Sequence, residues 1–408
     1  MTDVTRIRAG RLVEVVAGEV LTDQLLIARG ERIESVGPYD DGPVDVDLSN
    51  HTMLPGLIDC HAHLIGEVES GHGYAALVQR TGAQEALSGV RNARDTIMAG
   101  FTSVRDVGTF RAFVDVALRD AIEAGDVLGP RMLCAGAYVT SSGGGGDVTG
   151  LAPDVDAVVP RDLRFGVANS PDEVRKAVRE ILHGGADFIK VIATGAVLTE
   201  GTVPSAPEFS EAEIRAAVEE AALYETHVAA HAHGAEGIKR AVRAGVRSIE
   251  HGSLMDDESI ALMAEHGTFL VADVWMGDWS IEQGEREGWS PDVMRKLRET
   301  TDVQREGFAK AVEAGVRIAF GTDSGTYPHG MNAKQFASMV KYGMTPLEAI
   351  RSATVIAAEL LGWRDRVGAL EPGLFADLVA VEGDVMNDVD LLTDVVFVMK
   401  GGRVVSAT

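Results

Sequence analysis

The chain predicts an α/β fold because one unit recurs along it: a helical stretch, a small residue with a glycine, and a short apolar strand ending in a polar residue. A glycine directly after a helix supplies the left-handed residue that closes it, and strands alternating with helices indicate parallel βα units. The small-residue and glycine pairs are Ala99-Gly100, Gly184-Gly185, Ala244-Gly245 and Ala314-Gly315.

Eight such strands are expected, with helical segments between most of them. Their ranges are 56–60, 101–106, 131–138, 187–193, 227–231, 247–250, 268–274 and 317–322. Two helix starts are marked by capping signals: Ser210 with Glu213, and Thr345 followed by Pro346 and Glu348. Eight βα units predict a (β/α)8 barrel of the TIM type.

Both ends of the chain differ from this pattern, because they alternate short apolar strands with turns. We therefore expect the two ends to meet in space as one small β-sandwich. The predicted domains are residues 1–54 with 366–408 as a composite β-sandwich, and residues 55–365 as the barrel.

Composition narrows the function. The 37 basic and 62 acidic residues give a formal net charge of -25, which disfavours nucleic acid and anionic membranes as partners. Cys60 and Cys134 are the two cysteines, so no disulfide framework is implied and a reducing cytoplasm is the expected location. The start of the chain has no apolar signal core, and no apolar run approaches the ~20 residues that span a bilayer. We expect a cytoplasmic protein that acts on a small molecule.

Polar side chains end several of the predicted strands. His61 and His63 end the first, and because side chains alternate along a strand, both imidazoles point the same way and can hold one divalent cation. Lys190, His231, His251 and Asp323 end the fourth, fifth, sixth and eighth strands. In a barrel these strand ends converge on one pocket. Imidazole and carboxylate together suit zinc, with manganese or iron as alternatives.

Each of these residues also has a structural interpretation. Lys190 could form an ion pair with an internal carboxylate such as Asp187, and Asp323 could cap the next helix. The strand-end histidines could be core imidazoles satisfied by a neighbour. Arg105 and Asp106 could form an internal ion pair beneath the site.

Other residues are candidates for substrate contact. Gly144 and Gly145 belong to a glycine run after the third strand, where backbone could approach a ligand, although a crossover without contact fits equally well. Trp275 and Met276 follow the seventh strand and could wall the pocket, although core packing explains them equally well. His329 follows Asp323 closely enough to line the pocket.

A series of motifs, taken in order, resembles the metal-dependent amidohydrolase superfamily over essentially the whole chain, specifically its imidazolonepropionase-like and prolidase-like branch. The motifs are Pro55-Gly-Leu-Ile-Asp59 before the histidine pair, Arg105-Asp-Val-Gly108, Ile249-Glu-His-Gly252, Gly321-Thr-Asp323 and the closing Gly373-Leu-Phe-Ala-Asp-Leu378.

The resemblance implies a role for each strand-end residue. His61, His63 and Asp323 would hold one metal ion, and His231 and His251 a second. Lys190 would be carboxylated by carbon dioxide and bridge the two ions, because a carbamate supplies two anionic oxygens where a free ammonium would repel the cations. Asp323 would take the proton of a shared water and return it to the leaving nitrogen. His233, two residues past His231, would contact the substrate.

The resemblance further implies a binuclear zinc hydrolase that cleaves an amide bond and forms a homo-oligomer, often an octamer. The expected activity is that of a dipeptidase or carboxypeptidase that releases a C-terminal amino acid from a dipeptide or N-acyl amino acid. The alternative substrate is a small non-peptide amide, urea, carbamate or cyclic amide, including xenobiotics. A non-catalytic scaffold is the second alternative, and the complete set of ligands argues against it. Related sequences often carry a histidine where 143–146 is all glycine, which leaves the dipeptide specificity open.

Overall fold

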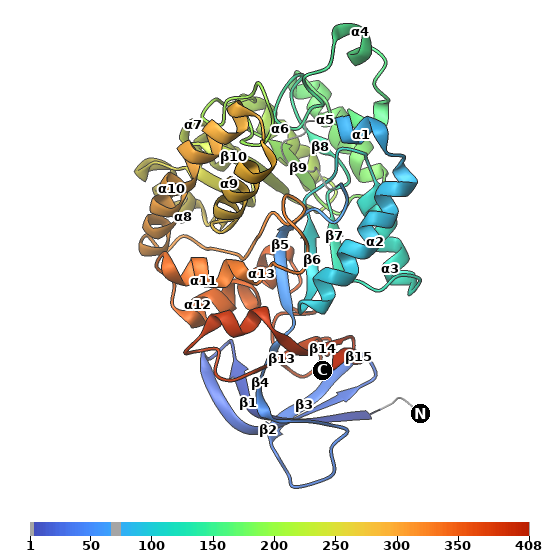
Figure 1. The fold of residues 1–408 in the computed structure, drawn as a ribbon, viewed down its shortest axis with the longest axis vertical. Helices are drawn as coiled ribbons and strands as arrows, with labels where there is room; N and C mark the ends of the chain where they lie inside the picture. The colour runs from blue at the N-terminus through green and yellow to red at the C-terminus, as the bar shows by residue number, and fades with distance from the viewer. Residues whose placement is uncertain (1–3, 67–74, 408) are drawn as a thin grey trace.

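The computed structural model of the chain describes residues 4–66 and 75–407. Figure 1 shows a large part of mixed helices and strands above a smaller part made of strands from both ends of the chain. Within the described residues, no helix is both long and apolar enough to cross a membrane.

Parallel strands at the centre of the large part form two sheets. The first contains β5 (Leu57–Ala62), β6 (Phe101–Asp106) and β7 (Arg131–Cys134), in the order β5-β6-β7. The second has the order β12-β11-β10-β9-β8. Its strands are β8 (Tyr138–Val139), β9 (Ile189–Ile192), β10 (Val228–Gly234), β11 (Ser248–Leu254) and β12 (Phe269–Val271). The strand ranges predicted from the sequence coincide with these strands except at two places.

The third predicted strand, 131–138, divides into β7 and β8. β7 pairs with β6, with Cys134 opposite Asp106, whereas β8 pairs with β9, with Tyr138 opposite Lys190. The chain between them turns, because the Ala137 N–H donates to the carbonyl of Ala135 at 2.8 Å. One stretch of chain therefore connects the two sheets.

The eighth predicted strand, 317–322, is not a regular strand. It lies between the outer strands of the two sheets, since the Ala319 N–H donates to Leu270 of β12 and the Cys60 N–H of β5 donates to Phe320. The Phe320 N–H donates to Ser352 instead of to either strand, which interrupts the ladder.

Helices follow most of the strands and cover them. They are α1 (Ala75–Gln79), α2 (Gly82–Met98), α3 (Val114–Ala124), α4 (Pro153–Asp156), α5 (Pro171–His183), α6 (Glu211–Ala222), α7 (Ala235–Ala244), α8 (Asp257–His266), α9 (Met276–Glu287), α10 (Pro291–Glu313), α11 (Lys334–Lys341), α12 (Pro346–Ser352) and α13 (Val355–Leu361). Two 3-10 helices span Arg161–Leu163 and Val389–Thr393. The capping boxes predicted at Ser210 and Thr345 open α6 and α12. Gly245 closes α7 with a φ of 96°, as predicted from the sequence.

The main core lies between these helices and the strands. Ile189 and Val191 of β9 are buried in it beside Ile181 of α5 and Ile214 of α6. Because strand side chains alternate, Lys190 and Ile192 face the opposite side of β9, where they line a cavity. The same alternation decides which residues of each strand reach the site.

The smaller part is one seven-stranded mixed sheet with the order β15-β14-β13-β4-β1-β2-β3. Its strands are β1 (Val4–Glu14), β2 (Glu19–Arg29), β3 (Arg32–Pro38), β4 (Val46–Pro55), β13 (Leu378–Glu382), β14 (Val395–Lys400) and β15 (Arg403–Ala407). β13 pairs with β4, which joins the two ends of the chain. Buried apolar side chains from both ends, including Leu26, Met53, Leu378 and Phe397, form its core.

Candidate metal centre

A cavity lies at the carboxyl ends of the parallel strands, and every metal ligand expected from the sequence lines it. These residues are His61, His63, Lys190, His231, His251 and Asp323, and His233 lines the same cavity. The prediction that strand-end residues converge on one pocket therefore agrees with the structure.

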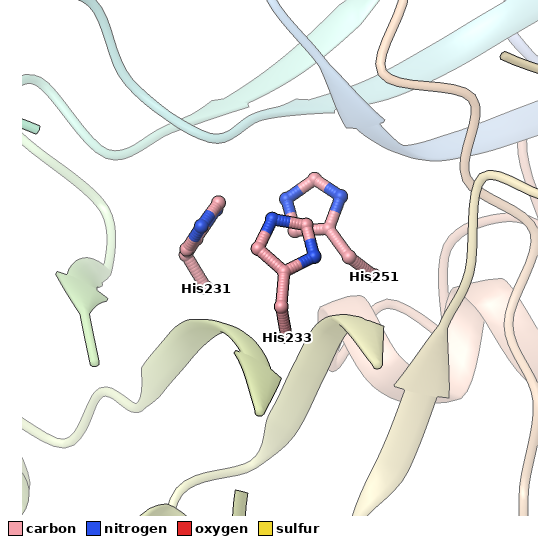
Figure 2. A group of neighbouring side chains, drawn as sticks. All are labelled: His231, His233 and His251. Atoms are coloured by element: carbon pink, nitrogen blue, oxygen red, sulfur yellow. The ribbon is translucent and has the colours of Figure 1, made fainter. Parts of the chain in front are cut away.

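Two groups of three side chains are close enough to hold a metal ion. In each group the three ligand atoms all lie within 4.8 Å of one another. The first group, His231, His233 and His251, comes from β10 and β11 and is drawn in Figure 2. The second is His61, His251 and Asp323. His233 was expected to contact substrate, and its position also allows it to bind a metal.

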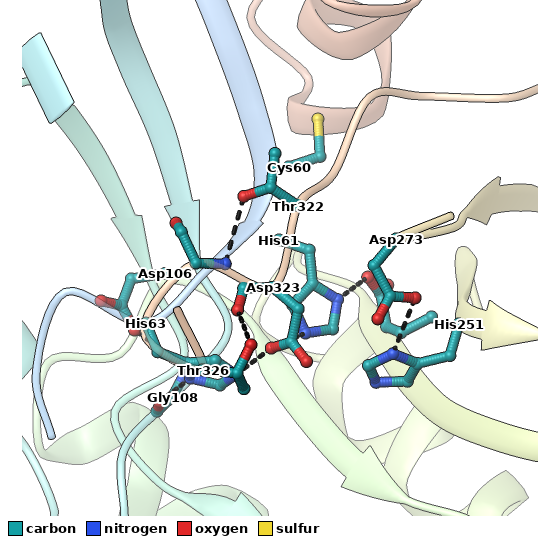
Figure 3. Close-up of polar contacts among 12 residues, drawn as sticks. Cys60, His61, His63, Asp106, Gly108, His251, Asp273, Thr322, Asp323 and Thr326 are labelled. Carbon is teal, nitrogen blue, oxygen red and sulfur yellow. Dashed lines mark hydrogen bonds and ion pairs between the residues drawn. The ribbon is translucent and has the colours of Figure 1, made fainter. Parts of the chain in front are cut away.

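Asp323 lies between the two histidines of the first strand. Its Oδ1 is 3.4 Å from Nε2 of His61 and 3.3 Å from Nε2 of His63. Figure 3 shows the three side chains pointing toward one another. Burial favours the neutral carboxyl, but the close contacts with His61 and His63 outweigh it and hold the pKa of Asp323 well below its usual value. Asp323 is therefore a carboxylate at neutral pH.

The opposite nitrogens of these histidines are held by groups behind the site. Nδ1 of His61 lies 2.8 Å from Oε2 of Glu250, and Nδ1 of His63 lies 2.7 Å from the carbonyl oxygen of Gly108. A hydrogen bond at Nδ1 fixes the tautomer and leaves Nε2 free to bind a metal. Both rings therefore present Nε2 to the cavity.

His251 and His231 also have surroundings that suit them to bind a metal ion. Nδ1 of His251 lies 3.1 Å from Oδ1 of Asp273, which also accepts the amide of Gln304 at 2.9 Å. Nε2 of His231 is buried and has no hydrogen-bond partner among the described residues. Burial, together with the nearby His233 and His251, keeps the pKa of His231 well below its usual value, so its ring is neutral. A buried, neutral and unpartnered ring nitrogen is suited to bind a cation.

Lys190 lies deep in the cavity with a side chain that is 2% exposed. Asp187, one carboxylate suggested as its partner, pairs instead with Arg119 at 2.7 Å. Burial is the main cause that lowers the pKa of Lys190 to about 8; the Arg105 guanidinium also lowers it, whereas the Glu250 and Asp323 carboxylates oppose this. An amine with such a pKa is partly neutral near physiological pH and can react with carbon dioxide.

The backbone is strained at two of the candidate ligands. His251 has a φ of 67° and Asp323 a φ of 57°, the left-handed region that non-glycine residues rarely occupy. Such strain persists where the surrounding structure holds it and is found at functional sites. Asp323 does not cap a helix, because α11 begins at Lys334 and its N-cap residue is Ala333.

Arg105 does not pair with Asp106, because neighbouring residues on β6 point to opposite faces. Instead Nη2 of Arg105 lies 2.7 Å from Oε1 of Glu250, and its Nε donates to the carbonyl of Cys60 at 2.6 Å. Asp106 accepts the backbone N–H of Leu64 at 2.8 Å. Arg105 thus holds Glu250, which in turn holds His61.

Of the residues expected to contact substrate, the structure places His233, Gly145 and Met276 in the cavity wall. Trp275 lies outside it, with its ring against Tyr327 at a centroid distance of 4.9 Å. His329 is turned away from the cavity, since its Nε2 lies 3.0 Å from the carbonyl oxygen of His63.

Gly144 also lies outside the residues that line the cavity. Its N–H donates to the carbonyl of Ser141 at 3.0 Å, within the turn that the glycine run forms. The next residue, Gly145, donates its N–H to Glu208 at 2.8 Å and reaches the cavity.

Glu250 and Asp273 have no role predicted from the sequence. Asp273 follows β12 and so had the same strand-end signal as the chosen residues. Glu250 is completely buried within β11, and a carboxylate inside an apolar strand is itself a sign of a partner.

The rest of the wall is mainly apolar. Its side chains include Ile65, Leu77, Phe110, Ile192, Val197, Leu198 and Met276. Among the described residues that line the cavity, Lys190 is the only lysine or arginine. A bound molecule would therefore meet an apolar surface beside a polar cluster of histidines and the carboxylate of Asp323, with a second carboxylate, Glu200, elsewhere in the wall.

Comparison with known proteins agrees with this site. Residues 52–406 match the model of the amidohydrolase family, and the chain belongs to that family, whose members depend on metal. It is a hydrolase that acts on C–N bonds.

Similar proteins cover nearly the full chain. Ochratoxinase of Aspergillus niger is 34% identical over 98% of this chain and 86% of its own length. A Xaa-Pro dipeptidase with bound methionine has a TM-score of 0.93 at 38% identity, covering 99% of this chain and all of that one. A prolidase complexed with N-methylphosphonate-L-proline has a TM-score of 0.90 at 31% identity, covering 100% of both chains.

Proposed function

We propose that this chain is a binuclear metal-dependent hydrolase that releases a C-terminal amino acid from a dipeptide or an N-acyl amino acid with a large apolar group. The observation that carries the proposal is the gathering of five histidines, the carboxylate of Asp323 and a buried lysine at one end of the parallel strands, beside a largely apolar wall. The names of the relatives support it, since two are a dipeptidase and a prolidase.

In this proposal His61, His63 and Asp323 would hold one ion, His231 and His251 would hold the second, and a carboxylated Lys190 would supply an anionic oxygen to each. Zinc is the metal that this donor set favours. When bound, the two ions would polarise the amide carbonyl and lower the pKa of a water molecule. The unpartnered Nε2 of His231 and the hydrogen bonds behind His61 and His63 support the assignment.

The residues of the chain would then position the substrate and move one proton. Asp323 is a carboxylate whose Oδ1 lies within 3.4 Å of Nε2 of both His61 and His63, so its orientation is fixed. We infer that it accepts the proton of the attacking water and passes it to the leaving nitrogen. His233, at the edge of the histidine cluster, would donate a hydrogen bond to the free carboxylate of the substrate.

The alternative substrate, a neutral amide, urea or carbamate, is favoured by one observation. Apart from Lys190, no lysine or arginine among the described residues lines the cavity to receive a substrate carboxylate. The two proposals are separated by measuring hydrolysis of matched pairs of substrates, each pair an apolar N-acyl amino acid and its C-terminal amide. Ochratoxin is added to this substrate panel because one relative is named ochratoxinase.

We expect the free acids to be hydrolysed at least tenfold better in kcat/KM, because an amide would leave donors unpaired at a cost of about 1–3 kcal/mol each. Equal or faster hydrolysis of the amides or of neutral ureas would reject the peptidase proposal. Protein without activity toward any member of the panel, despite full metal content, would favour a scaffold.

We also infer that the parallel strands close a (β/α)8 barrel over residues 55–365, with 1–54 and 366–408 forming a β-sandwich beside it. Support comes from the segment 317–322, which is hydrogen-bonded to β12 on one side and to β5 on the other. The pairing of β4 with β13 supports the composite second domain. A homo-oligomer is proposed as well, and light scattering of the purified chain tests it.

A further inference from the structure

A buried lysine outside the metal centre holds one wall of the cavity. Lys296 of α10 is 1% exposed. Its Nζ lies 2.6 Å from the carbonyl oxygen of Thr199, and it also contacts the carbonyl oxygens of Ala196 at 3.3 Å and Thr202 at 3.4 Å. The carboxylate of Asp292, one turn earlier on α10, lies 3.1 Å away. The ammonium is thus surrounded by oxygens that accept its three hydrogens.

The three carbonyls belong to one stretch of chain, the segment 195–203, which follows β9. Residues of this segment from Ala196 to Glu200 line the cavity. The side chain of Thr202 closes the segment on itself, since its Oγ1 accepts the Ala196 N–H at 3.1 Å. Lys296 therefore contacts the backbone of the same residues that line the cavity.

The segment has a second support on the same helix. Val197 is buried in a cluster with Trp289, Met294 and Leu297. These apolar contacts hold the side chain of Val197 but give no direction to the neighbouring carbonyls. Buried carbonyls need donors, and in this turn the ammonium of Lys296 supplies them together with the Thr202 hydroxyl, whose Oγ1 lies 3.0 Å from the carbonyl oxygens of both Ala196 and Thr199. The carbonyl of Thr202 itself contacts Lys296.

We propose that Lys296 is a positioning residue that sets the shape of the apolar wall and thereby the preference of the enzyme for substrates with a large apolar group. This inference rests on the proposed function, since it concerns the substrate wall of the same cavity. Lys296 touches neither the candidate ligands nor Asp323 in any contact of the structure, so metal binding and proton transfer do not depend on it directly.

The first test compares Lys296→Met with Lys310→Met, a control on the same helix whose ammonium is exposed and pairs with Asp257. For an N-acyl amino acid with a large apolar acyl group, Lys296→Met should raise KM roughly tenfold. For the N-formyl analogue, which reaches less of the wall, KM should change little, and kcat and metal content should match the control. An equal loss on both substrates, or a loss confined to kcat, would overturn the proposal.

The second test needs no substrate and so stays informative if the proposed function fails. Hydrogen exchange of the backbone amides of 195–203 should be faster in Lys296→Ala and in Lys296→Met than in the parent chain, with little change in β9. Lys296→Arg, which keeps charge and donors, should restore much of the protection. Unchanged exchange in the two truncated variants would overturn the proposal.

Chemical rescue separates the ammonium from the rest of the side chain. In Lys296→Ala, added ammonium chloride should slow the exchange of 195–203 again, because a free ammonium ion can donate to the same carbonyls. Tetramethylammonium chloride at equal concentration has the charge but no donor and should have no effect. Rescue by both salts alike would show an ionic-strength effect and contradict the proposed hydrogen-bonding role.

Discussion

Glu250 lies directly behind His61, with its Oε2 2.8 Å from Nδ1 of the ring, although neither residue neighbours the other in sequence. The other oxygen of Glu250 lies 2.7 Å from Nη2 of Arg105. Burial alone would raise the pKa of Glu250, but Arg105 and His61 lower it far more, so it stays charged. A carboxylate in this place orients the ring and makes its free nitrogen a stronger ligand.

Glu250→Gln should therefore weaken metal binding by about 10–100-fold, since the amide keeps the shape but loses the charge. It should also reduce the free energy of unfolding by up to about 3–5 kcal/mol, because the buried guanidinium of Arg105 loses its partner. Zinc titration of the metal-free protein and urea unfolding measure the two effects. Glu359→Gln, which removes an exposed ion pair with Arg317, is the control. Parent-like zinc affinity would show that His61 needs no carboxylate behind it.

The sequence was sufficient to predict the site residues that lie at the ends of strands. His61, Lys190 and His231 follow apolar stretches of chain, and parallel topology alone brings such residues together at one edge. Glu250 and Asp273 could not be assigned partners in this way, because their contacts depend on how strands far apart in sequence are set against one another.

The remaining differences have the same origin. The third predicted strand divides where its first half pairs with β6 and its second half with β9, and no feature of its apolar pattern shows the change of partner. Trp275 follows a strand as Asp323 does, yet it packs on Tyr327 because α9 begins at the next residue. The sequence around Lys296 is that of an ordinary helix lysine. Its side chain is buried because α10 packs against residues 195–203 in the tertiary structure.

Reconstitution of the metal-free protein should depend on pH through Lys190, whose pKa burial lowers to about 8. Only the neutral amine reacts with carbon dioxide, so at constant dissolved carbon dioxide the rate of zinc-dependent reactivation should rise roughly tenfold from about pH 7 to pH 9. Lys190→Met should bind less than two ions and show no dependence on carbon dioxide. Reactivation in carbon dioxide-free buffer at the parent rate would contradict a carbamate.

The same group affects the stability of the metal-free protein. The folded pKa of about 8 lies below the ordinary lysine value of 10.5, so the unfolded chain binds more protons between these two values. The contribution of Lys190 is therefore unfavourable below about pH 8 and is relieved as pH rises toward 10.5. Urea unfolding should show a larger rise in the metal-free parent than in Lys190→Met, because Lys400, whose pKa burial also lowers to about 8, contributes equally to both.

Asp323→Asn tests the proton-transfer role. Asparagine tolerates the left-handed backbone that Asp323 adopts at a φ of 57°, so the variant should fold. It keeps one ligating oxygen but cannot accept the proton, and kcat should fall by about 10²–10⁴ with zinc largely retained. Asp172→Asn, which changes a fully exposed carboxylate on α5, is the control. Turnover near that of the parent would remove Asp323 from proton transfer.

His233→Gln decides between the two roles that the structure allows for this residue. Its ring lies 4.5 Å from that of His231 and 4.8 Å from that of His251, while its Nδ1 lies 2.8 Å from Oγ of Ser253. The contact with Ser253 fixes the ring and leaves Nε2 as the atom that can donate to a substrate carboxylate or bind a metal. Burial lowers the pKa of His233 to about 3, so the ring acts as a neutral donor.

If His233 binds the substrate carboxylate, the variant should keep two zinc ions and lose roughly 10–100-fold in kcat/KM on free acids, since a hydrogen bond to a charged group contributes about 1.5–3 kcal/mol. Hydrolysis of the matching C-terminal amides should change little, because they lack that charge. His266→Gln, at the exposed end of α8, controls for the loss of a histidine. Loss of one zinc ion, with acids and amides affected alike, would instead make His233 a ligand beside His231 and His251.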